Sequence, residues 1–205
     1  MKVTVLVVAT VDDRWISIHH SLTVPMFRLH SHINCPFYEV SQIDKIYGLD
    51  PSPELCEKAI GRAKECDMDI DFLINGAEEI KLKSESVDTV LITYTLCSIP
   101  NPADALKEIK RVMKSDAKIL FCEHGIAPDT KVSKWQNRIN PLWSKLFGGC
   151  NINRDIPEIL LDSGFKIQNL ENLGRRFQKH VLVFPCDPAC HWGAHAACGR
   201  RIRLS

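Results

Sequence analysis

The sequence has no excess of charge of either sign and no long apolar run. Its 205 residues include 26 Lys and Arg against 25 Asp and Glu, which gives a formal net charge of +1 at pH 7. A chain with this balance has no overall field to attract a polyanion, so nucleic acid is not an expected partner. No stretch approaches the roughly 20 apolar residues that span a bilayer, so we expect no integral membrane segment.

The features of a secreted protein are also missing. Met1 to Thr10 is apolar after Lys2, but the acidic pair Asp12 and Asp13 follows without a small-residue cleavage pattern, which argues against a signal peptide. The nine cysteines are odd in number and are scattered through segments that otherwise resemble strands and helices. This usage favours reduced thiols over a disulfide framework, so we expect a cytoplasmic protein.

The N-terminal part is regular only at its start. Val3 to Ala9 is rich in β-branched residues and predicts a buried strand with both faces covered. Asp12 to Pro36 shows no sustained period of either kind, and Pro25 lies within it. No element is predicted for that segment.

From Ile46 onward the chain alternates short apolar runs with helical patterns. Ile46 to Asp50 predicts a strand, and Ser52-Pro53-Glu54 begins a helix that should run to about Cys66. A second predicted helix begins at Asn101, and the further predicted strands are Phe72–Ile74, Val87–Thr93 and Ala117–Cys122. Repeated units of this length predict parallel strands with right-handed crossovers, and therefore an α/β fold with a doubly wound, mostly parallel sheet.

The pattern changes beyond Gly125. A tryptophan-bearing stretch, Trp135 to Phe147, comes before a predicted short helix from Asp155 to Ser163. Two β-like runs follow, Phe165 to Leu170 and His180 to Phe184. Their short separation predicts an antiparallel hairpin at one edge of the sheet.

These patterns predict one domain over residues 1–184, of which 1–33 are atypical, and a tail over residues 185–205. The tail contains five soft metal ligands, Cys186, Cys190, His191, His195 and Cys198. Their spacing matches no established zinc pattern, so we predict no metal site.

In a doubly wound sheet the ligand lies beyond the carboxyl ends of the strands, so the residues that follow each strand carry the functional argument. Asp50 could accept hydrogen bonds from both hydroxyls of a ribose, although an acid there also suits a helix N-terminus. Asn75 to Glu78 either form a plain turn or let backbone amides approach a flat adenine edge. Cys97, in the run Thr93 to Ser98, is interpreted as a buried inert thiol because no partner base is evident.

These segments form part of a longer resemblance. Four of them, in order, resemble successive motifs of the class I methyltransferases of the type 11 group: Tyr47–Ser52, Asn75–Ile80, Val87–Val90 with Leu96–Pro100, and Leu106–Val112. Further segments resemble the branch that contains the small-thiol methyltransferases: Phe121–Pro128, Trp135–Gln136, Pro141–Trp143 and Gly148–Cys150. The resemblance covers roughly Asn34 to Phe184.

The resemblance implies a Rossmann-like methyltransferase fold and S-adenosylmethionine as cofactor. It implies that Asp50 holds the ribose and that Thr93 borders the cofactor. The residues around the adenine would be Gly76, Ala77 and Glu78.

The resemblance also implies methyl transfer to a small-molecule acceptor, such as a thiol. Displacement at a sulfonium methyl needs alignment and a dry approach more than an elaborate set of acids and bases, so no catalytic residue is predicted. His124, Trp135 and Arg138 are candidates for the acceptor side, with a packing or surface role as the alternative for each.

One motif of the family has no counterpart in the sequence. Members carry a glycine-rich turn after the first strand, where the backbone approaches the methionine part of the cofactor. That turn should come before Asn34 to Tyr38, yet Met1 to Ile33 contains no glycine. Two hypotheses therefore stand: an active methyltransferase, or a non-catalytic or truncated methyltransferase-like module that acts by binding a partner. An NAD-linked dehydrogenase would equally lack its glycine fingerprint and would leave the later motifs unexplained.

Overall fold

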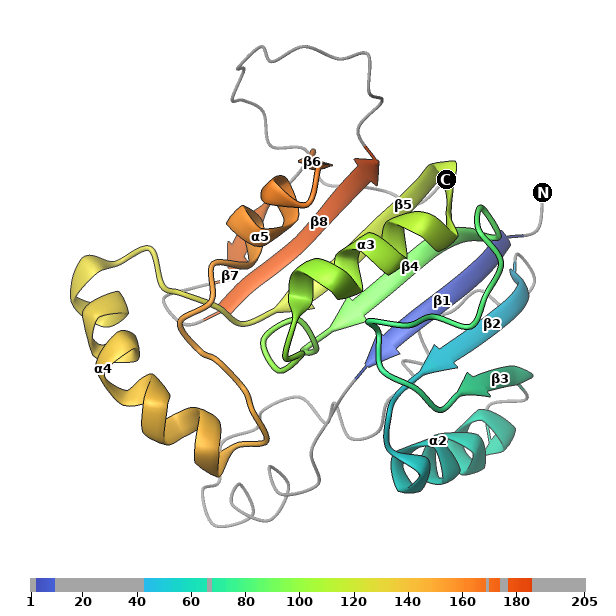
Figure 1. Cartoon of the computed structure of the whole chain (residues 1–205), viewed down its shortest axis with the longest axis horizontal. Coiled ribbons are helices and arrows are strands. Elements are labelled where there is room, and N and C mark those ends of the chain that lie inside the picture. Colours follow the sequence, from blue (N-terminus) through green and yellow to red (C-terminus); the bar gives the residue numbers. More distant parts are fainter. Residues whose placement is uncertain (1–2, 10–42, 66–67, 169, 174–176, 186–205) are drawn as a thin grey trace.

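The computed structural model describes residues 3–9, 43–65, 68–168, 170–173 and 177–185. An eight-stranded sheet forms its centre, with strand order β3-β2-β1-β4-β5-β8-β6 and with β7 paired to β8 (Figure 1). The strands are β1 (Val3–Ala9), β2 (Ile43–Leu49), β3 (Ile70–Leu73), β4 (Val87–Thr93), β5 (Met113–Glu123), β6 (Phe165–Ile167), β7 (Glu171–Leu173) and β8 (Phe177–Pro185). The helices are α2 (Pro53–Glu65), α3 (Pro102–Val112), α4 (Thr130–Leu146) and α5 (Ile156–Asp162).

Five strands, β3, β2, β1, β4 and β5, form a parallel core. Strand β1 has the bounds predicted from the sequence and lies in the middle, where Val5 pairs with Ile46 of β2 and with Thr89 of β4. Without this inner strand, the parallel sheet would expose two unpaired edges. β1 occupies that position, although the sequence after it lacks the expected glycines.

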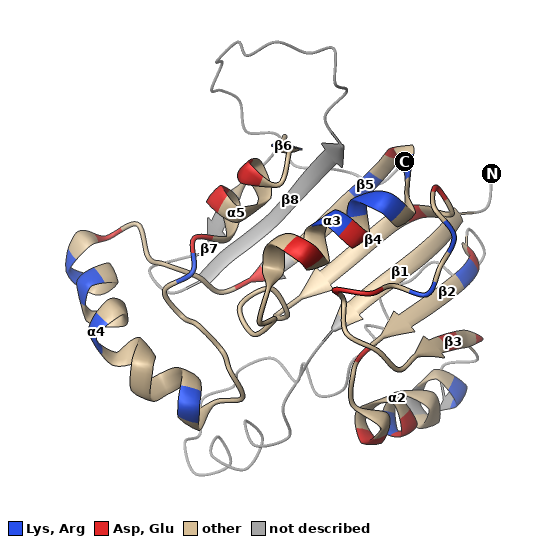
Figure 2. Cartoon of the chain, in the orientation of Figure 1, with Lys and Arg blue, Asp and Glu red and all other residues tan. Residues whose placement is uncertain are grey.

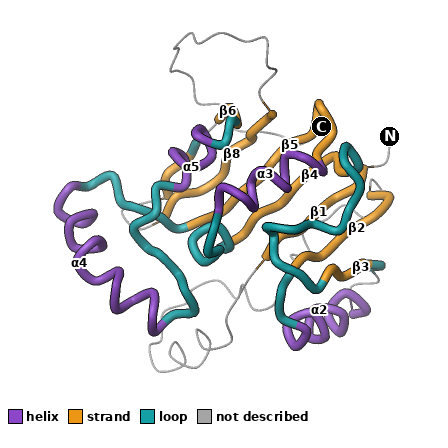
Figure 3. The backbone as a smooth tube through the Cα atoms, viewed as in Figure 1, coloured by secondary structure: helices purple, strands orange, loops and turns teal. Residues whose placement is uncertain are grey.

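Helices cover both faces of this sheet (Figures 1 and 3). Successive side chains of a strand point to opposite faces, and β1 shows this alternation. Leu6 and Val8 join the large core beneath α3 and α5, whereas Val5 and Val7 join a smaller core beneath α2. The predicted doubly wound α/β architecture is therefore confirmed.

Helix α3 shows why these segments become helices. Asn101 caps its first turn by accepting a hydrogen bond from the Asp104 amide at 3.4 Å, and Pro102 occupies the first helical position. Its buried residues recur at helical spacing, while acid lies in the first turn and base in the last, as Figure 2 shows. This order opposes the helix dipole at both ends and stabilises the helix.

The C-terminal edge of the sheet is antiparallel. β8 pairs antiparallel with β5, and β6 pairs antiparallel with β8. The edge is more elaborate than the predicted hairpin, because β7 lies between β6 and β8 in sequence and also pairs with β8. Strand β8 begins at Phe177, three residues before the predicted start at His180.

The tryptophan-bearing stretch, for which no element was predicted, lies in α4 except for Phe147, which caps the C-terminus of that helix. All 17 residues of α4 are described, and none of them is buried. Figure 1 shows α4 standing beyond the carboxyl end of the sheet rather than against one of its faces. In the described part of the chain, no helix combines the length and the apolar character needed to cross a membrane.

Candidate functional site

The five parallel strands end at one edge of the sheet, and the predicted site residues follow them there. Ala9, Thr93 and Cys122 are level with one another in the register of β1, β4 and β5. Leu49 of β2 is likewise level with Leu73 of β3. Because the strands are parallel, the connections that follow them lie side by side at this edge, which is where α/β folds bind ligands.

Asp50 is the most specific feature of this edge. It follows β2, is only 7% exposed, and its backbone amide donates to the Leu73 carbonyl at 3.3 Å. The Ser52 amide donates to Oδ1 at 2.8 Å, which holds the side chain in one orientation. Within the described residues, the buried Oδ2 has no hydrogen-bond partner. Burial raises the pKa of Asp50 to about 6, against the lowering effect of the Ser52 amide.

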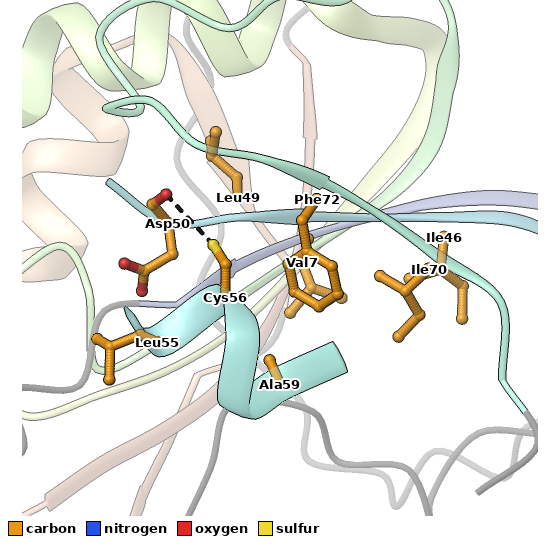
Figure 4. Close-up of a pocket in the computed structure, with 10 residues that line it drawn as sticks. Val7, Ile46, Leu49, Asp50, Leu55, Cys56, Ala59, Ile70 and Phe72 are labelled. Carbon is orange, nitrogen blue, oxygen red and sulfur yellow. Dashed lines mark hydrogen bonds between the residues drawn. The ribbon is translucent and has the colours of Figure 1, made fainter. Parts of the chain in front are cut away.

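Asp50 also borders a narrow cavity between α2 and the sheet (Figure 4). The other lining side chains are apolar apart from Cys56, and the enclosed space has room for about one water molecule. A Cβ on Gly48 would lie 2.6 Å from Cε1 of Phe72, so glycine is required where that ring crosses β2. The cavity is therefore a packing feature beneath the carboxylate, and a nucleotide-sized ligand must lie outside it, beyond the strand end.

The predicted adenine segment forms a tight turn after β3. The Glu79 amide donates to the Gly76 carbonyl at 3.3 Å, and Nδ2 of Asn75 donates to the same carbonyl at 3.1 Å. Ala77 is buried in the large core, whereas Gly76 and Glu78 are half-buried. A Cβ on Gly76 would lie 2.7 Å from a carboxylate oxygen of Glu78, so the glycine leaves room for that side chain.

Thr93 is the last residue of β4 and is half-buried at the same edge. Its carbonyl accepts a hydrogen bond from Oγ1 of Thr95 at 2.9 Å, and this hydroxyl also lies 3.1 Å from the carbonyl of Val8 in β1. Thr95 therefore ties the end of β4 to the end of β1. Along the carboxyl edge of the sheet, Thr93 lies between Asp50 on one side and the end of β5 on the other.

Glu123, which the sequence analysis did not single out, organises the neighbouring loop. It ends β5, is fully buried, and its Oε1 accepts hydrogen bonds from the amides of Thr95 and Leu96 at 2.5 and 2.9 Å. Burial raises the pKa of Glu123 to about 7, and the two amides oppose this rise. Between Thr93 and Thr95 the chain passes through the left-handed region at Tyr94, with φ of 49°. The loop is thus held in a strained turn by a buried carboxylate.

His124, Cys97 and Cys150 come together next to this carboxylate. Cys97 and Cys150 are buried, and Nε2 of His124 lies 3.2 Å from Sγ of Cys150. One ligand atom from each of the three side chains lies within 4.8 Å of the other two. Cys97 is buried, as interpreted from the sequence, and the two side chains beside it follow β5 and α4, which are distant from it in sequence.

The contacts within this cluster shift the pKa values of Cys97, His124 and Cys150 by different amounts and in different directions. A hydrogen bond with Cys97, and then one with His124, lowers the pKa of the Cys150 thiol. The same contact with Cys150, together with burial, raises the pKa of Cys97. Burial by itself lowers the pKa of His124, but the hydrogen bond to Cys150 raises it, and the net change is a rise. Of the two thiols, Cys150 is therefore the one that ionises more readily.

Of the three predicted acceptor-side residues, only His124 lies at the strand ends. Trp135 and Arg138 are exposed on α4, and the Trp135 side chain is 63% exposed. Gln136 is one of the α4 residues that do contact the rest of the domain: its Oε1 accepts from the Ala127 amide at 2.8 Å and its Nε2 donates to the Gly125 carbonyl at 3.0 Å. The glycine-less segment, residues 10–33, lies outside the described residues.

A parallel core with helices on both faces and polar groups at the carboxyl edge defines the Rossmann-like class of α/β proteins. Within this class, residues 33–121 match the family model described as a methyltransferase domain. A SAM-dependent methyltransferase structure from Methanosarcina mazei superimposes with a TM-score of 0.62 over 90% of this chain and 92% of that one, at 15% identity. The shared fold and the family match confirm the predicted resemblance to the class I methyltransferases.

Two relatives carry the resemblance to the thiol branch. The chain is 29% identical over 116 residues to thiol S-methyltransferase TMT1B of Rattus norvegicus, covering 54% of this chain and 47% of that protein. It is also 29% identical over 129 residues to thiol S-methyltransferase TMT1A of Homo sapiens, covering 61% of this chain and 53% of that protein. The chain thus spans about half the length of these relatives.

Proposed function

We propose that this protein transfers a methyl group from S-adenosylmethionine to a small-molecule acceptor, and that the acceptor is a thiol. The family match and the two thiol S-methyltransferase relatives support this proposal. The single structural observation that carries it is the Asp50 carboxylate, buried at the edge where such folds bind ligands, with Oδ2 unpaired among the described residues.

The chemistry of Asp50 fits a ribose. A buried carboxylate oxygen without a donor is costly, and the hydroxyls of a ribose are donors that would offset this cost. The Ser52 amide occupies Oδ1 and so leaves Oδ2 as the acceptor, in an orientation set before any ligand arrives. Gly76, Ala77 and Glu78 would then border the adenine, and Thr93 the part of the cofactor nearer the acceptor.

When bound, the cofactor supplies an electrophilic sulfonium methyl. The protein's part in such a displacement is to align the acceptor and to exclude water. Thr95, Leu96 and Cys97, beside Thr93, are fully buried, so this part of the edge would exclude water, and Glu123 holds the backbone amides of Thr95 and Leu96 in place. A thiol acceptor would approach from the side of His124. The expected cytoplasmic location is part of the proposal, because reduced thiols persist there.

The competing hypothesis is a methyltransferase-like module that binds a protein partner and no cofactor. The observation that favours it is the absence of glycine from residues 1–33, where the family places its methionine-binding turn. The two hypotheses differ in whether Asp50 is used, because a module without cofactor has no need of a buried, unpaired carboxylate.

Calorimetric titration of the purified chain with S-adenosylmethionine and with its demethylated product separates the two hypotheses. We expect binding in the micromolar range that Asp50→Ala abolishes. Asp44→Ala is the matched control, because Asp44 lies exposed on β2, the strand that Asp50 follows, and this variant should leave binding unchanged. If the folded wild-type chain bound neither compound, the methyltransferase proposal would be wrong and the partner-binding module would stand.

A further inference from the structure

Cys97, His124 and Cys150 reach one point from three separate segments of the chain. Cys97 lies in the loop after β4, His124 directly follows β5, and Cys150 lies in the connection after α4. Their ligand atoms lie within 4.8 Å of one another. Around a tetrahedral zinc ion, with bonds of about 2.0 to 2.3 Å, neighbouring ligand atoms are about 3.3 to 3.8 Å apart, so small side-chain rotations would bring all three onto one ion.

The backbone that carries these ligands is already held in place. The Asn151 amide donates to the Cys97 carbonyl at 2.8 Å, and Nδ2 of Asn151 approaches the same oxygen at 3.2 Å. Nη1 of Arg154 donates to the carbonyls of Leu96 and Ile99 at 2.5 and 2.7 Å. The segments that carry Cys97 and Cys150 are therefore joined by hydrogen bonds, so an ion would bind to a site that is largely formed.

The ligand chemistry selects a soft divalent cation. Two thiolates and one neutral imidazole suit zinc, and their two negative charges would balance the charge of the ion in a buried site. Among the described residues, no fourth Cys, His, Asp or Glu atom joins the group. Three protein ligands with one open position is the arrangement of catalytic rather than structural zinc sites.

We propose that Cys97, His124 and Cys150 bind one zinc ion, and that the open fourth position receives the acceptor thiol. The second half of this statement rests on the proposed function. On coordination the acceptor thiol gives up its proton to solvent and becomes a thiolate. Its sulfur lone pair then forms the new bond to the methyl carbon, while the electrons of the breaking carbon–sulfur bond remain on the sulfur of the departing cofactor product.

Metal content tests the site itself. The full chain is purified with a phosphine reductant and its zinc is measured by mass spectrometry. We expect close to one zinc ion per wild-type chain and loss of that ion in Cys150→Ser and in His124→Ala. Cys56→Ser is the matched control, because Cys56 is a buried cysteine on α2 outside the cluster, and this variant should keep its zinc.

Cobalt substitution tests the ligands without depending on any variant. In wild-type protein loaded with Co²⁺, thiolate ligands produce intense sulfur-to-metal charge-transfer absorption, and tetrahedral geometry produces strong visible bands. We expect both, and we expect mercaptoethanol to shift the visible bands as it enters the fourth position. Absence of charge-transfer absorption, or a disulfide between Cys97 and Cys150 in freshly reduced protein, would overturn the zinc site.

The outcomes also separate this inference from the proposed function. A chain that methylates thiols without bound metal would refute the zinc site and leave the function standing. A chain that binds zinc and shifts its cobalt spectrum with mercaptoethanol, yet binds no S-adenosylmethionine, would refute the function and leave the metal site. A cobalt spectrum that mercaptoethanol does not alter would refute the role of the fourth position in acceptor binding.

Discussion

The carboxylate of Glu123 at the end of β5 accepts a hydrogen bond of 2.5 Å from the backbone amide of Thr95, in the loop that follows β4. A buried acid that binds two successive amides determines the course of this loop, and with it the positions of Thr93 and Cys97. The edge where a methyl acceptor would approach is therefore built by a residue that need not touch the acceptor.

Replacing Glu123 by Ala should destabilise the protein. The change leaves the amides of Thr95 and Leu96 buried without their acceptor, and each such loss costs about 1 to 3 kcal/mol. We expect the free energy of unfolding in urea to fall by about 2 to 4 kcal/mol. Glu57→Ala, at an exposed position on α2, should change it by less than about 0.5 kcal/mol. Equal stabilities for the two variants would contradict this account of the loop.

Asp50 should make the free protein less stable at neutral pH than at mildly acidic pH. Its pKa is raised from 3.8 to about 6, so the folded state disfavours the charged form. The cost is present in full above pH 6, at about 1.4 kcal/mol for each pKa unit, and disappears as the pH falls from 6 towards 4. Asp50→Asn should therefore raise the free energy of unfolding by about 2 to 3 kcal/mol at pH 7.5 and by much less at pH 4.5. Urea titrations at the two pH values measure the difference, and an equal gain at both would contradict the burial of the charge.

The same carboxylate should make cofactor binding depend on pH in the opposite direction. Ribose hydroxyls donate to the ionised form, so the affinity for S-adenosylmethionine should fall about tenfold for each pH unit below about 6 and level off above it. Calorimetric titration between pH 5 and 8 follows this change. The product without its methyl group should show the same profile, because it carries the same ribose. A flat profile would mean that Asp50 does not hold the ribose.

The inner position of β1 predicts a large effect of a small truncation. Leu6 is fully buried in the large core, so Leu6→Ala should lower the free energy of unfolding by about 2 to 5 kcal/mol. Ile74→Ala removes a comparable side chain that is 54% exposed and should cost less than about 1 kcal/mol. Guanidinium unfolding followed by tryptophan fluorescence compares the two. If Leu6→Ala left the free energy of unfolding nearly unchanged, β1 would not be the central strand of the folded protein.

Much of this fold follows from local patterns. The strands Val3–Ala9 and Val87–Thr93 have the bounds predicted for them, because each is a short segment rich in β-branched residues. The α3 helix was also predicted, from its Asn101 cap, Pro102 and the spacing of its apolar residues. The α4 helix was not predicted, since none of its residues is buried and Pro141 interrupts its pattern.

Some residues of the candidate site could likewise be identified from local sequence, and others could not. Asp50 and the turn at Gly76 were identified because they directly follow strands, and a position after a strand is a local property. The carboxylate of Glu123 could have been noticed for the same reason, as an acid that ends an apolar strand. Whether Trp135 and Arg138 serve the acceptor stays a prediction, and their exposed positions on α4 do not place them beside His124.

Residue order alone was enough to specify a mostly parallel α/β domain with a carboxylate at the carboxyl edge of its sheet, because strand and helix patterns, caps and strand ends are encoded within a few neighbouring residues. The meeting of Cys97, His124 and Cys150 was decided only by the tertiary structure. These residues follow different elements, and their proximity depends on the order of β4 and β5 in the sheet and on the path of the chain after α4. No local pattern encodes such a distance, since it arises from the packing of whole elements against one another.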